Sequence, residues 1–295
     1  MASRFRPLAG CRIVSLALNI PGPVALAECR RLGARCRKVE PPAGDPVRSW
    51  SPTLYAELHT GVPVQAVDLK TPRGMATLHR ALARADVLLT AFRPQALDRL
   101  GLGWKALQAQ HPGLWQVAIQ GAAAAARANE AGHDLTYQAE HGLVVPGHLP
   151  RTLVADMAGA EAVVQAVLQA ALGRSRGDQP RRLVVGLADA AARMAAPQRW
   201  GLTQAGGLLG GAHAGYQVLQ ARDGWVALAA LEPHFAQRLA ALAGLGERPA
   251  WLGARTRSAV AAWVGGHSTA ELAALAAAHD LPLVVCPLGT SALAT

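Results

Sequence analysis

Three short segments of the chain place side chains that can exchange protons beside small or turn-forming residues. The side chains are those of His133, Asp156 and Glu232, and the segments are AGHDLTY at 131–137, ADMAGA at 155–160 and LEPHF at 231–235. A histidine or a carboxyl group can hold and release a proton near neutral pH once burial and neighbouring charges tune its pKa. These three residues are therefore the candidate catalytic set for proton-transfer chemistry.

Each candidate also has a purely structural interpretation. Asp156 precedes a run of small residues that predicts a helix, so its carboxylate could sit at the helix N-terminus, where free N–H groups favour negative charge, or could merely cap that helix. Asp134 could orient the ring of His133 through a hydrogen bond, but a histidine between glycine and aspartate also suits a loop or a cap. Glu232 could be a solvated acid that opens the helix containing Pro233. Spacing alone leaves these alternatives open.

Strand and helix patterns alternate through the first two thirds of the chain. Apolar strand patterns occupy 11–18, 35–42, 86–92, 114–121 and the start of 181–196. Helical spacing of apolar residues lies between them, at 24–34, 69–85, 94–113 and 155–173. Such alternation predicts an α/β fold with a parallel sheet covered on both faces.

The pattern of the sequence changes near residue 197. Residues 197–215 are glycine-rich and are typical of a crossing between domains. Residues 216–230 contain two short strands around an Arg-Asp-Gly turn, which predicts a hairpin. Three helical segments follow at 233–246, 255–264 and 268–280, and 281–288 is the last predicted strand.

Composition excludes several classes of protein. The 29 basic and 19 acidic residues give a net charge of +10, but the arginines are scattered and no basic run is interleaved with aromatics, so we expect no nucleic-acid partner. A solvated, arginine-rich surface or an anionic small ligand explains the charge. The four cysteines show no CxxC spacing, which gives no support to a metal site. With no signal peptide and no apolar run long enough to span a membrane, we expect a cytoplasmic, soluble protein without a membrane partner.

An ordered series of landmarks resembles the family III CoA-transferases, which include carnitine-CoA transferases, formyl-CoA transferases and α-methylacyl-CoA racemases. The landmarks are NIPGP, the segment GARCRKVEPPAGDPVR, VDLKTPRG, FRPQALDRLGLGWKAL, HPGLWQVAIQG, AGHDLTYQAEHGL, LVADMAGA, DGWVALAALEPHF and LPLVVCPL. The resemblance implies a Rossmann-like large domain with a parallel sheet and a smaller α+β domain. We place the large domain at 1–196 with a return segment at 281–295, the interdomain crossing at 197–214 and the small domain at 215–280.

The resemblance also implies chemistry on acyl-CoA thioesters, with CoA as substrate and no metal or redox cofactor. In the transferases, the aspartate at the position of Asp156 attacks the thioester, forms a mixed anhydride and then exchanges CoA between carboxylic acids. In the racemases, Asp156 and His133 would remove and return the α-proton from opposite faces, with Glu232 in support. For CoA itself, Phe92 would lie by the adenine and Arg99 would meet a phosphate.

Two departures from the family pattern affect the expected CoA groove. The usual lysine and arginine are absent from LHTGV at 58–62, and a loop usually rich in glycine is GAAAAARANEAG at 121–132. A run of alanines turns helical more readily and cannot bring backbone N–H groups as close to a ligand. A catalytically silent homologue is therefore a third hypothesis. Family members form homodimers of interlocked rings, so we expect a homodimer, although a chain this short for the family predicts altered interlocking or a reduced member.

Overall fold

The computed structural model describes residues 5–287, which divide into two compact units. The first unit is Met1–Ala195 and the second is Ala196–Thr295. The residues placed in the interdomain crossing, 197–214, all belong to the second unit, where a short helix α10 (Ala196–Arg199) and a turn of π-helix η2 (Leu208–Ala212) interrupt them. Each unit has a sheet and a hydrophobic core of its own.

The first unit is built on a six-stranded parallel sheet with the order β3-β2-β1-β4-β5-β6. The strands are β1 (Arg12–Ser15), β2 (Arg35–Glu40), β3 (Val64–Ala66), β4 (Val87–Thr90), β5 (Trp115–Gln120) and β6 (Arg182–Gly186). The predicted α/β class with a Rossmann-like sheet is confirmed. The edge strand β3 was not predicted, because it is only three residues long and polar at its centre.

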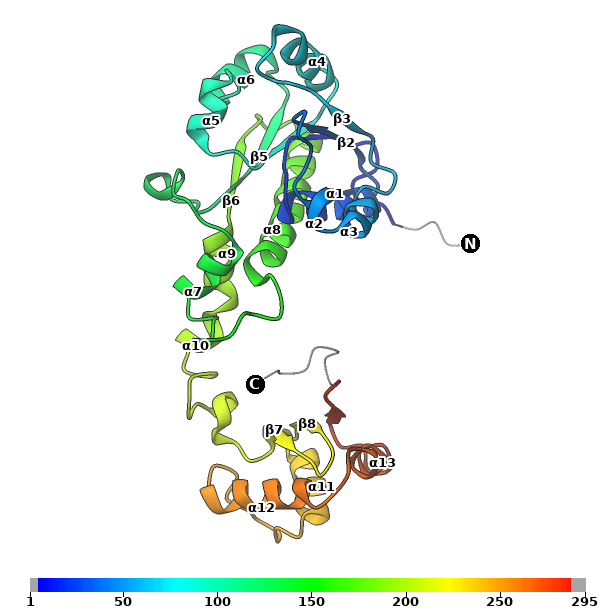
Figure 1. The fold of residues 1–295 in the computed structure, drawn as a ribbon, viewed down its shortest axis with the longest axis vertical. Helices are drawn as coiled ribbons and strands as arrows, with labels where there is room; N and C mark the ends of the chain where they lie inside the picture. The colour runs from blue at the N-terminus through cyan, green and yellow to red at the C-terminus, as the bar shows by residue number, and fades with distance from the viewer. Residues whose placement is uncertain (1–4, 288–295) are drawn as a thin grey trace. The chain divides into compact units, whose positions relative to one another are not determined.

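Helices cover both faces of this sheet (Figure 1). They are α1 (Pro21–Arg31), α2 (Val47–Trp50), α3 (Pro52–Leu58), α4 (Pro72–Leu82), α5 (Pro94–Arg99), α6 (Trp104–Gln110), α7 (Asp134–Glu140), α8 (Val154–Ser175) and α9 (Leu187–Met194). Successive strand residues point to opposite faces, so Ile13 and Leu89 pack under α1 and α8, whereas Val14 and Leu88 pack under α4, α5 and α6. Three layers result, and the central strands β1, β4 and β5 are buried between them, with Gln116 and Gln120 of β5 as buried polar side chains on one face.

The helix that carries Asp156 is α8, which has 22 residues. It is apolar almost all round, as its sequence predicts, and it packs against α1 on one side and α9 on the other. At its far end, Arg174 Nη2 lies 3.2 Å from Oδ1 of the buried Asp86, which precedes β4. The helix therefore runs from the carboxyl edge of the sheet to the amino edge.

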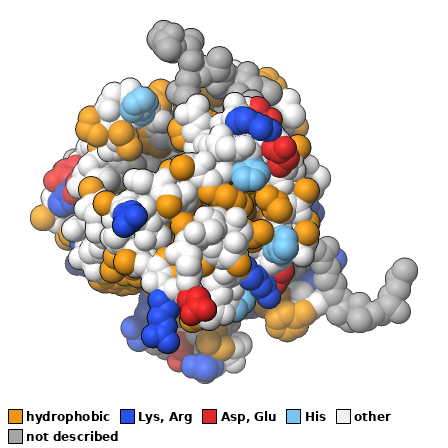
Figure 2. Space-filling view, turned by 90° about the horizontal axis from the view of Figure 1, so that it is seen from below, with side chains coloured by type: hydrophobic (Ala, Val, Ile, Leu, Met, Phe, Trp, Pro, Cys, Tyr) orange, Lys and Arg blue, Asp and Glu red, His pale blue; other side chains and the backbone are white. Residues whose placement is uncertain are grey.

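The second unit has a three-stranded sheet, β7-β8-β9, formed by β7 (Tyr216–Gln220), β8 (Trp225–Ala229) and β9 (Leu283–Val285). The helices α11 (Pro233–Leu242), α12 (Ala254–Gly265) and α13 (Thr269–His279) complete it. This is the predicted smaller α+β fold, with the predicted hairpin at β7 and β8. On the face shown in Figure 2, basic and acidic side chains lie among apolar ones.

One part of the predicted domain organisation needs correction. We expected 281–295 to return to the large domain, but β9 pairs with β8 in the sheet of the second unit. The physical reason is that Leu281 and Leu283 are buried in the core of the second unit. Their strand, β9, pairs with β8 and so extends the sheet of that unit. The remaining residues of the expected return, 288–295, lie outside the described part of the chain.

Candidate active site

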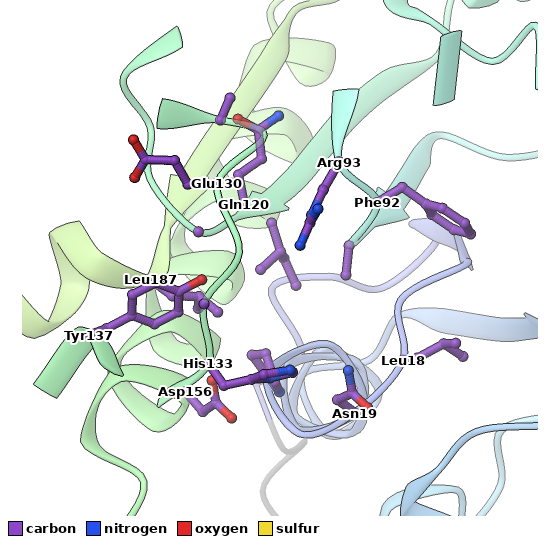
Figure 3. A pocket seen from close by; sticks show the side chains of 16 residues that line it. Leu18, Asn19, Phe92, Arg93, Gln120, Glu130, His133, Tyr137, Asp156 and Leu187 are labelled. Carbon is purple, nitrogen blue, oxygen red and sulfur yellow. The ribbon is translucent and has the colours of Figure 1, made fainter. Parts of the chain in front are cut away.

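The candidate active site is a pocket of about 200 Å³ at the carboxyl edge of the parallel sheet (Figure 3). The strand order reverses direction between β1 and β4, and ligands of open parallel sheets bind where the order reverses. The loops after β1 and β4 line the pocket with Asn19 and Phe92, and β5 ends in it at Gln120. From the other side, the starts of α7 and α8 supply His133 and Asp156.

Asp156 is the third residue of α8, and the cap position is occupied by Leu153, which makes no side-chain cap. The interpretation of Asp156 as a simple N-cap is therefore wrong, and its carboxyl group is free to face the pocket. Burial, together with the nearby charge of Asp134, raises the pKa of Asp156 to about 7. A carboxyl group with this pKa exchanges its proton at neutral pH, which an ordinary aspartate does not.

Asp134 is the buried partner that holds the start of α8. Its Oδ1 accepts a hydrogen bond from the backbone N–H of Asp156 at 3.0 Å, and its Oδ2 accepts one from Nε2 of Gln138 at 2.5 Å. The same Gln138 amide donates to the carbonyl of Thr152 at 3.0 Å. Our suggestion that Asp134 orients the His133 ring is thus incorrect, because both carboxylate oxygens are directed to the α7–α8 junction. Asp134 instead positions Asp156 and places a negative charge beside it.

His133 is the cap residue of α7 and is exposed. Its backbone N–H donates to Oγ1 of Thr136 at 3.1 Å, and that hydroxyl donates back to the His133 carbonyl at 2.8 Å. The cap is therefore made by the backbone and Thr136, and the imidazole is left to line the pocket. Figure 3 shows the ring of His133 and the carboxylate of Asp156 on the same side of the pocket.

Tyr137 is a pocket residue that the sequence reasoning missed. It is buried, and it packs with Ala155 and Ala188 between α8 and α9. Two glycines make room for its ring: a Cβ on Gly121 would lie 2.6 Å from the Tyr137 hydroxyl, and a Cβ on Gly132 would lie 2.5 Å from Cε1. Burial, and after it the charge of Asp156, raises the pKa of the Tyr137 phenol. The available signal was its position one helical turn after His133.

Two further polar residues reach the pocket without having been singled out, Arg93 and Gln120. Arg93 follows Phe92 directly after β4 and brings a positive charge (Figure 3). Gln120 is buried, and its Nε2 has no hydrogen-bond partner within residues 5–287. Gln120 ends the buried strand β5 beside Gly121, and Arg93 lies in the loop after β4. Their positions at the carboxyl ends of parallel strands, where such sheets bind ligands, were the available signal.

Of the two predicted CoA contacts and the predicted supporting acid, one residue lines the pocket and two do not. Phe92 lines the pocket, whereas Arg99 is exposed at the last position of α5 and is not among the residues that line it. Glu232 is the exposed cap residue of α11 in the second unit, without a side-chain cap hydrogen bond. The structure therefore brings together His133, Asp156 and Phe92. Among the described residues, no three His, Cys, Asp or Glu side chains converge as metal ligands.

Known proteins share both the sequence pattern and the fold of this site. The sequence pattern of CoA-transferase family III matches residues 8–291. The chain belongs to CoA-transferase family III. It is 28% identical over 274 residues to succinate–glutarate CoA-transferase of Agrobacterium fabrum, which is 83% of this chain and 68% of that protein. It is 28% identical over 256 residues to human alpha-methylacyl-CoA racemase, 81% of this chain and 65% of that protein.

A solved structure supports the same assignment. The crystal structure of the hypothetical protein Rv3272 from Mycobacterium tuberculosis superposes with a TM-score of 0.83 at 26% identity, over 95% of this chain and 83% of that one. The match reaches less than two thirds of the length of several curated relatives, such as 31% of succinyl-CoA–D-citramalate CoA-transferase of Chloroflexus aurantiacus. Family membership is thereby established, and the resemblance on which it was predicted is confirmed.

The two segments that depart from the family pattern have different roles in this member. The alanine-rich segment turns into a short 3₁₀ helix, η1 (Ala125–Arg127), and then lines the pocket with Ala128 and Glu130. Arg127 is held by Glu130 at 2.8 Å and by Glu140 at 2.7 Å. The segment therefore still forms a wall of the pocket, but the charge of Arg127 is neutralised by Glu130 and Glu140.

The segment 58–62 is joined to a buried ionic network. His59 Nε2 lies 2.9 Å from Nζ of the fully buried Lys38, which also pairs with Glu40 at 3.1 Å and with Asp45 at 2.5 Å. The other oxygen of Asp45 accepts a hydrogen bond from the backbone N–H of Asn19 at 3.2 Å. Asn19 has a φ of 66°, a left-handed conformation that needs such support. The network thus holds the β1–α1 turn against the pocket.

Proposed function

We propose that this protein is an acyl-CoA enzyme that transfers CoA between carboxylic acids, with Asp156 as the reacting carboxylate. The single observation that carries the proposal is the placement of Asp156. Its carboxyl group does not cap α8, and it lines the pocket where the strand order of the sheet reverses. Its pKa is raised to about 7. Family membership supplies the substrate class, because its relatives include CoA-transferases.

In the proposed reaction, an oxygen of ionised Asp156 attacks the thioester carbonyl carbon, the carbon–sulfur bond breaks, and CoA leaves as its thiolate. The product is a mixed anhydride of the acyl group and Asp156. The thiolate then attacks the aspartyl carbonyl and releases the first carboxylic acid as its anion, and the second acid reverses both steps. A carboxylate that reacts covalently divides one difficult exchange into easier ones.

Two neighbours suit the charges that develop in these steps. Arg93 would attract the anionic carboxylate of the donor or acceptor acid, since a guanidinium binds carboxylates through paired hydrogen bonds. The free Nε2 of Gln120 would donate to the thioester oxygen as it gains negative charge, which is the usual task of a preorganised amide donor. Both side chains line the same pocket as Asp156.

The second candidate is α-methylacyl-CoA racemisation, and one observation favours it. His133 lines the pocket together with Asp156 and is not engaged as a cap through its ring. Two proton-exchanging groups in one pocket could remove the α-proton from one face of the acyl group and return it on the other. The family resemblance implies Glu232 as the supporting acid of this transfer.

The test compares the native chain with Asp156→Asn, Asp156→Ala and His133→Ala, assayed with a panel of acyl-CoA donors and carboxylate acceptors. We expect both Asp156 variants to lose activity by about a thousandfold or more. Hydroxylamine added during turnover should convert Asp156 to its hydroxamate, which mass spectrometry detects in the peptide that contains it. A wild-type level of activity in either Asp156 variant would overturn the proposal.

The same variants separate the two reactions. Full activity of His133→Ala would remove the racemase candidate. Entry of solvent deuterium at the α-carbon without exchange of CoA would instead remove the transferase. If CoA and acetyl-CoA show no micromolar binding by calorimetry, about −8 kcal/mol, and no acyl-CoA is turned over, the chain is the silent homologue.

A further inference from the structure

A second hollow of the first unit is lined by five arginines. It lies at the amino edge of the parallel sheet, the edge opposite to the Asp156 pocket, and has a volume of about 810 Å³. We name it the arginine groove; its polar lining is Arg12, Arg35, Arg37, Arg80, Arg84, Gln65 and Thr77. No acidic side chain is among its lining residues in the described chain.

The secondary structure itself brings the five guanidinium groups together. Arg12 of β1 is in register with Arg35 of β2, so the two side chains share one face of the sheet. Arg35 and Arg37 are two residues apart on β2 and point to the same face. That face is the one under α4, since Val39, the next residue of this series, belongs to the core beneath α4.

The other two arginines come from the end of α4 and the turn that follows it. Arg80 is in the last turn of α4 and donates to Oγ1 of Thr77 at 3.0 Å, and Arg84 lies two residues beyond the end of the helix at Leu82. The helix dipole favours cations at this end, which accounts for Arg80. It does not account for Arg35 and Arg37, which lie at the start of a strand.

This arrangement carries unrelieved repulsion. Like charges that lie directly across a strand pair, as Arg12 and Arg35 do, repel one another. Of the arginines that line the groove, Arg12 pairs with Asp86 at 3.3 Å, and Asp86 is shared with Arg174 at 3.2 Å. Within residues 5–287, Arg35, Arg37 and Arg84 form no salt bridge. A ligand with several negative charges would relieve this repulsion.

The lining also indicates the kind of anion. It contains no aromatic side chain on which bases could stack, which disfavours a nucleic acid. The volume lies within the range of small-molecule sites. We propose that the arginine groove binds a small polyphosphate anion, a ligand in which two or three phosphoryl groups are linked, with Arg35, Arg37 and Arg84 as its principal contacts and Gln65 and Thr77 as neutral donors.

The experiment is calorimetric titration of the full chain with inorganic triphosphate, and orthophosphate as the single-phosphoryl probe. We expect saturable binding of triphosphate, about tenfold or more tighter than orthophosphate, and a loss of about tenfold or more in the double variant Arg37→Gln/Arg84→Gln. Arg255→Gln, which removes an exposed arginine of α12 in the second unit, should bind as the native chain does. Circular dichroism checks that each variant is folded.

Several results would overturn the proposal. One is that triphosphate at millimolar concentration does not bind at low salt. Another is that Arg255→Gln loses as much triphosphate affinity as Arg37→Gln/Arg84→Gln does. A third is that a duplex oligonucleotide displaces triphosphate at a phosphate concentration lower than that of the triphosphate. A matching loss of acyl-CoA turnover in Arg37→Gln/Arg84→Gln would show that the groove belongs to the substrate site. Because triphosphate binding should be unchanged in Asp156→Asn, it can be judged whether or not the proposed transfer reaction is found.

Discussion

The backbone N–H of Asp156 donates a hydrogen bond of 3.0 Å to Oδ1 of Asp134. One buried carboxylate thus positions a second one and at the same time disfavours its ionisation. A carboxyl group whose pKa is raised by burial and by a neighbouring charge, as that of Asp156 is, suits acid–base chemistry. Asp134 is therefore a positioning residue, and its charge can be tested separately from its hydrogen bonds.

Replacing Asp134 by Asn should lower the pKa of Asp156. Asparagine can keep an acceptor for the Asp156 N–H but removes the charge that contributes to the raised pKa. The pKa should fall from about 7 without reaching the ordinary aspartate range, because burial is the larger cause and persists. Carbon-13 NMR of labelled aspartate carboxyl groups measures the midpoint directly. Asp178→Asn, an exposed site, serves as the control, and an unchanged midpoint in Asp134→Asn would refute the coupling.

The raised pKa of Asp156 should also make the protein less stable at neutral pH than at mild acidity. The folded state favours the protonated form, so this contribution is fully present below the unfolded pKa of about 4 and is lost as pH rises through the folded pKa of about 7. Asp156→Asn removes the cost of ionisation and should be more stable than the native chain at pH 8, by roughly 2 to 4 kcal/mol. Urea unfolding at pH 5 and pH 8 measures the difference. A gain that is equal at both pH values would contradict this explanation.

The fit of Tyr137 against two glycines predicts a selective rescue. Gly121→Ala and Gly132→Ala should each destabilise the protein, by about 1 to 3 kcal/mol, because the new methyl group meets the tyrosine ring. Tyr137→Phe removes the hydroxyl that lies nearest to Gly121, so it should rescue Gly121→Ala. It should not rescue Gly132→Ala, whose nearest contact is a ring carbon. Double-mutant cycles from thermal unfolding measure the free energy that Tyr137→Phe restores to Gly121→Ala and to Gly132→Ala. Equal restoration in the two would contradict the prediction.

Removal of Lys38 should be among the most damaging single changes in the first unit. Lys38→Met leaves Glu40 and Asp45 buried without their shared cation. Breaking a buried ion pair in this way costs about 3 to 5 kcal/mol, whereas Lys105→Met, at an exposed position, should cost little. Urea unfolding compares the two variants. A loss below 1 kcal/mol in Lys38→Met would mean that the two carboxylates find other partners.

The sequence predicted the sheet, the layers and the pocket's main carboxylate better than it predicted the contacts among them. Short apolar runs between helical segments identify β1 and β5, because composition and period are local properties of the chain. The bond from Asp156 to Asp134 joins residues 22 positions apart, and the spacing of the two carries no sign of it. Likewise, Asp156 looked like a cap because small residues follow it, but α8 begins two residues earlier, at Val154.

The missed pocket residues show a second limit. Tyr137 reads as an ordinary apolar position of α7, and only the absence of side chains at Gly121 and Gly132 gives it space. Lys38 reads as an exposed residue of an alternating strand, yet it is fully buried, with Glu40 and Asp45 close in sequence and His59 21 residues away as its partners. In both cases the contacts depend on how the chain folds back on itself, which the strand and helix periods do not specify.

Helix α8 has Asp156 in its first turn, where it lines the pocket, and Arg174 in its last turn, where it pairs with Asp86. Both placements depend on the direction in which the side chain points. Insertion of one residue between Asp156 and Arg174 would turn one end by about 100° relative to the other and lengthen the helix by about 1.5 Å. Either the carboxylate would leave the pocket or the guanidinium would leave Asp86. The stretch 157–173 should therefore admit substitutions but no insertions or deletions, whereas the loop before α8 can vary in length. The number of residues in α8 is thus as much a part of the site as their identity.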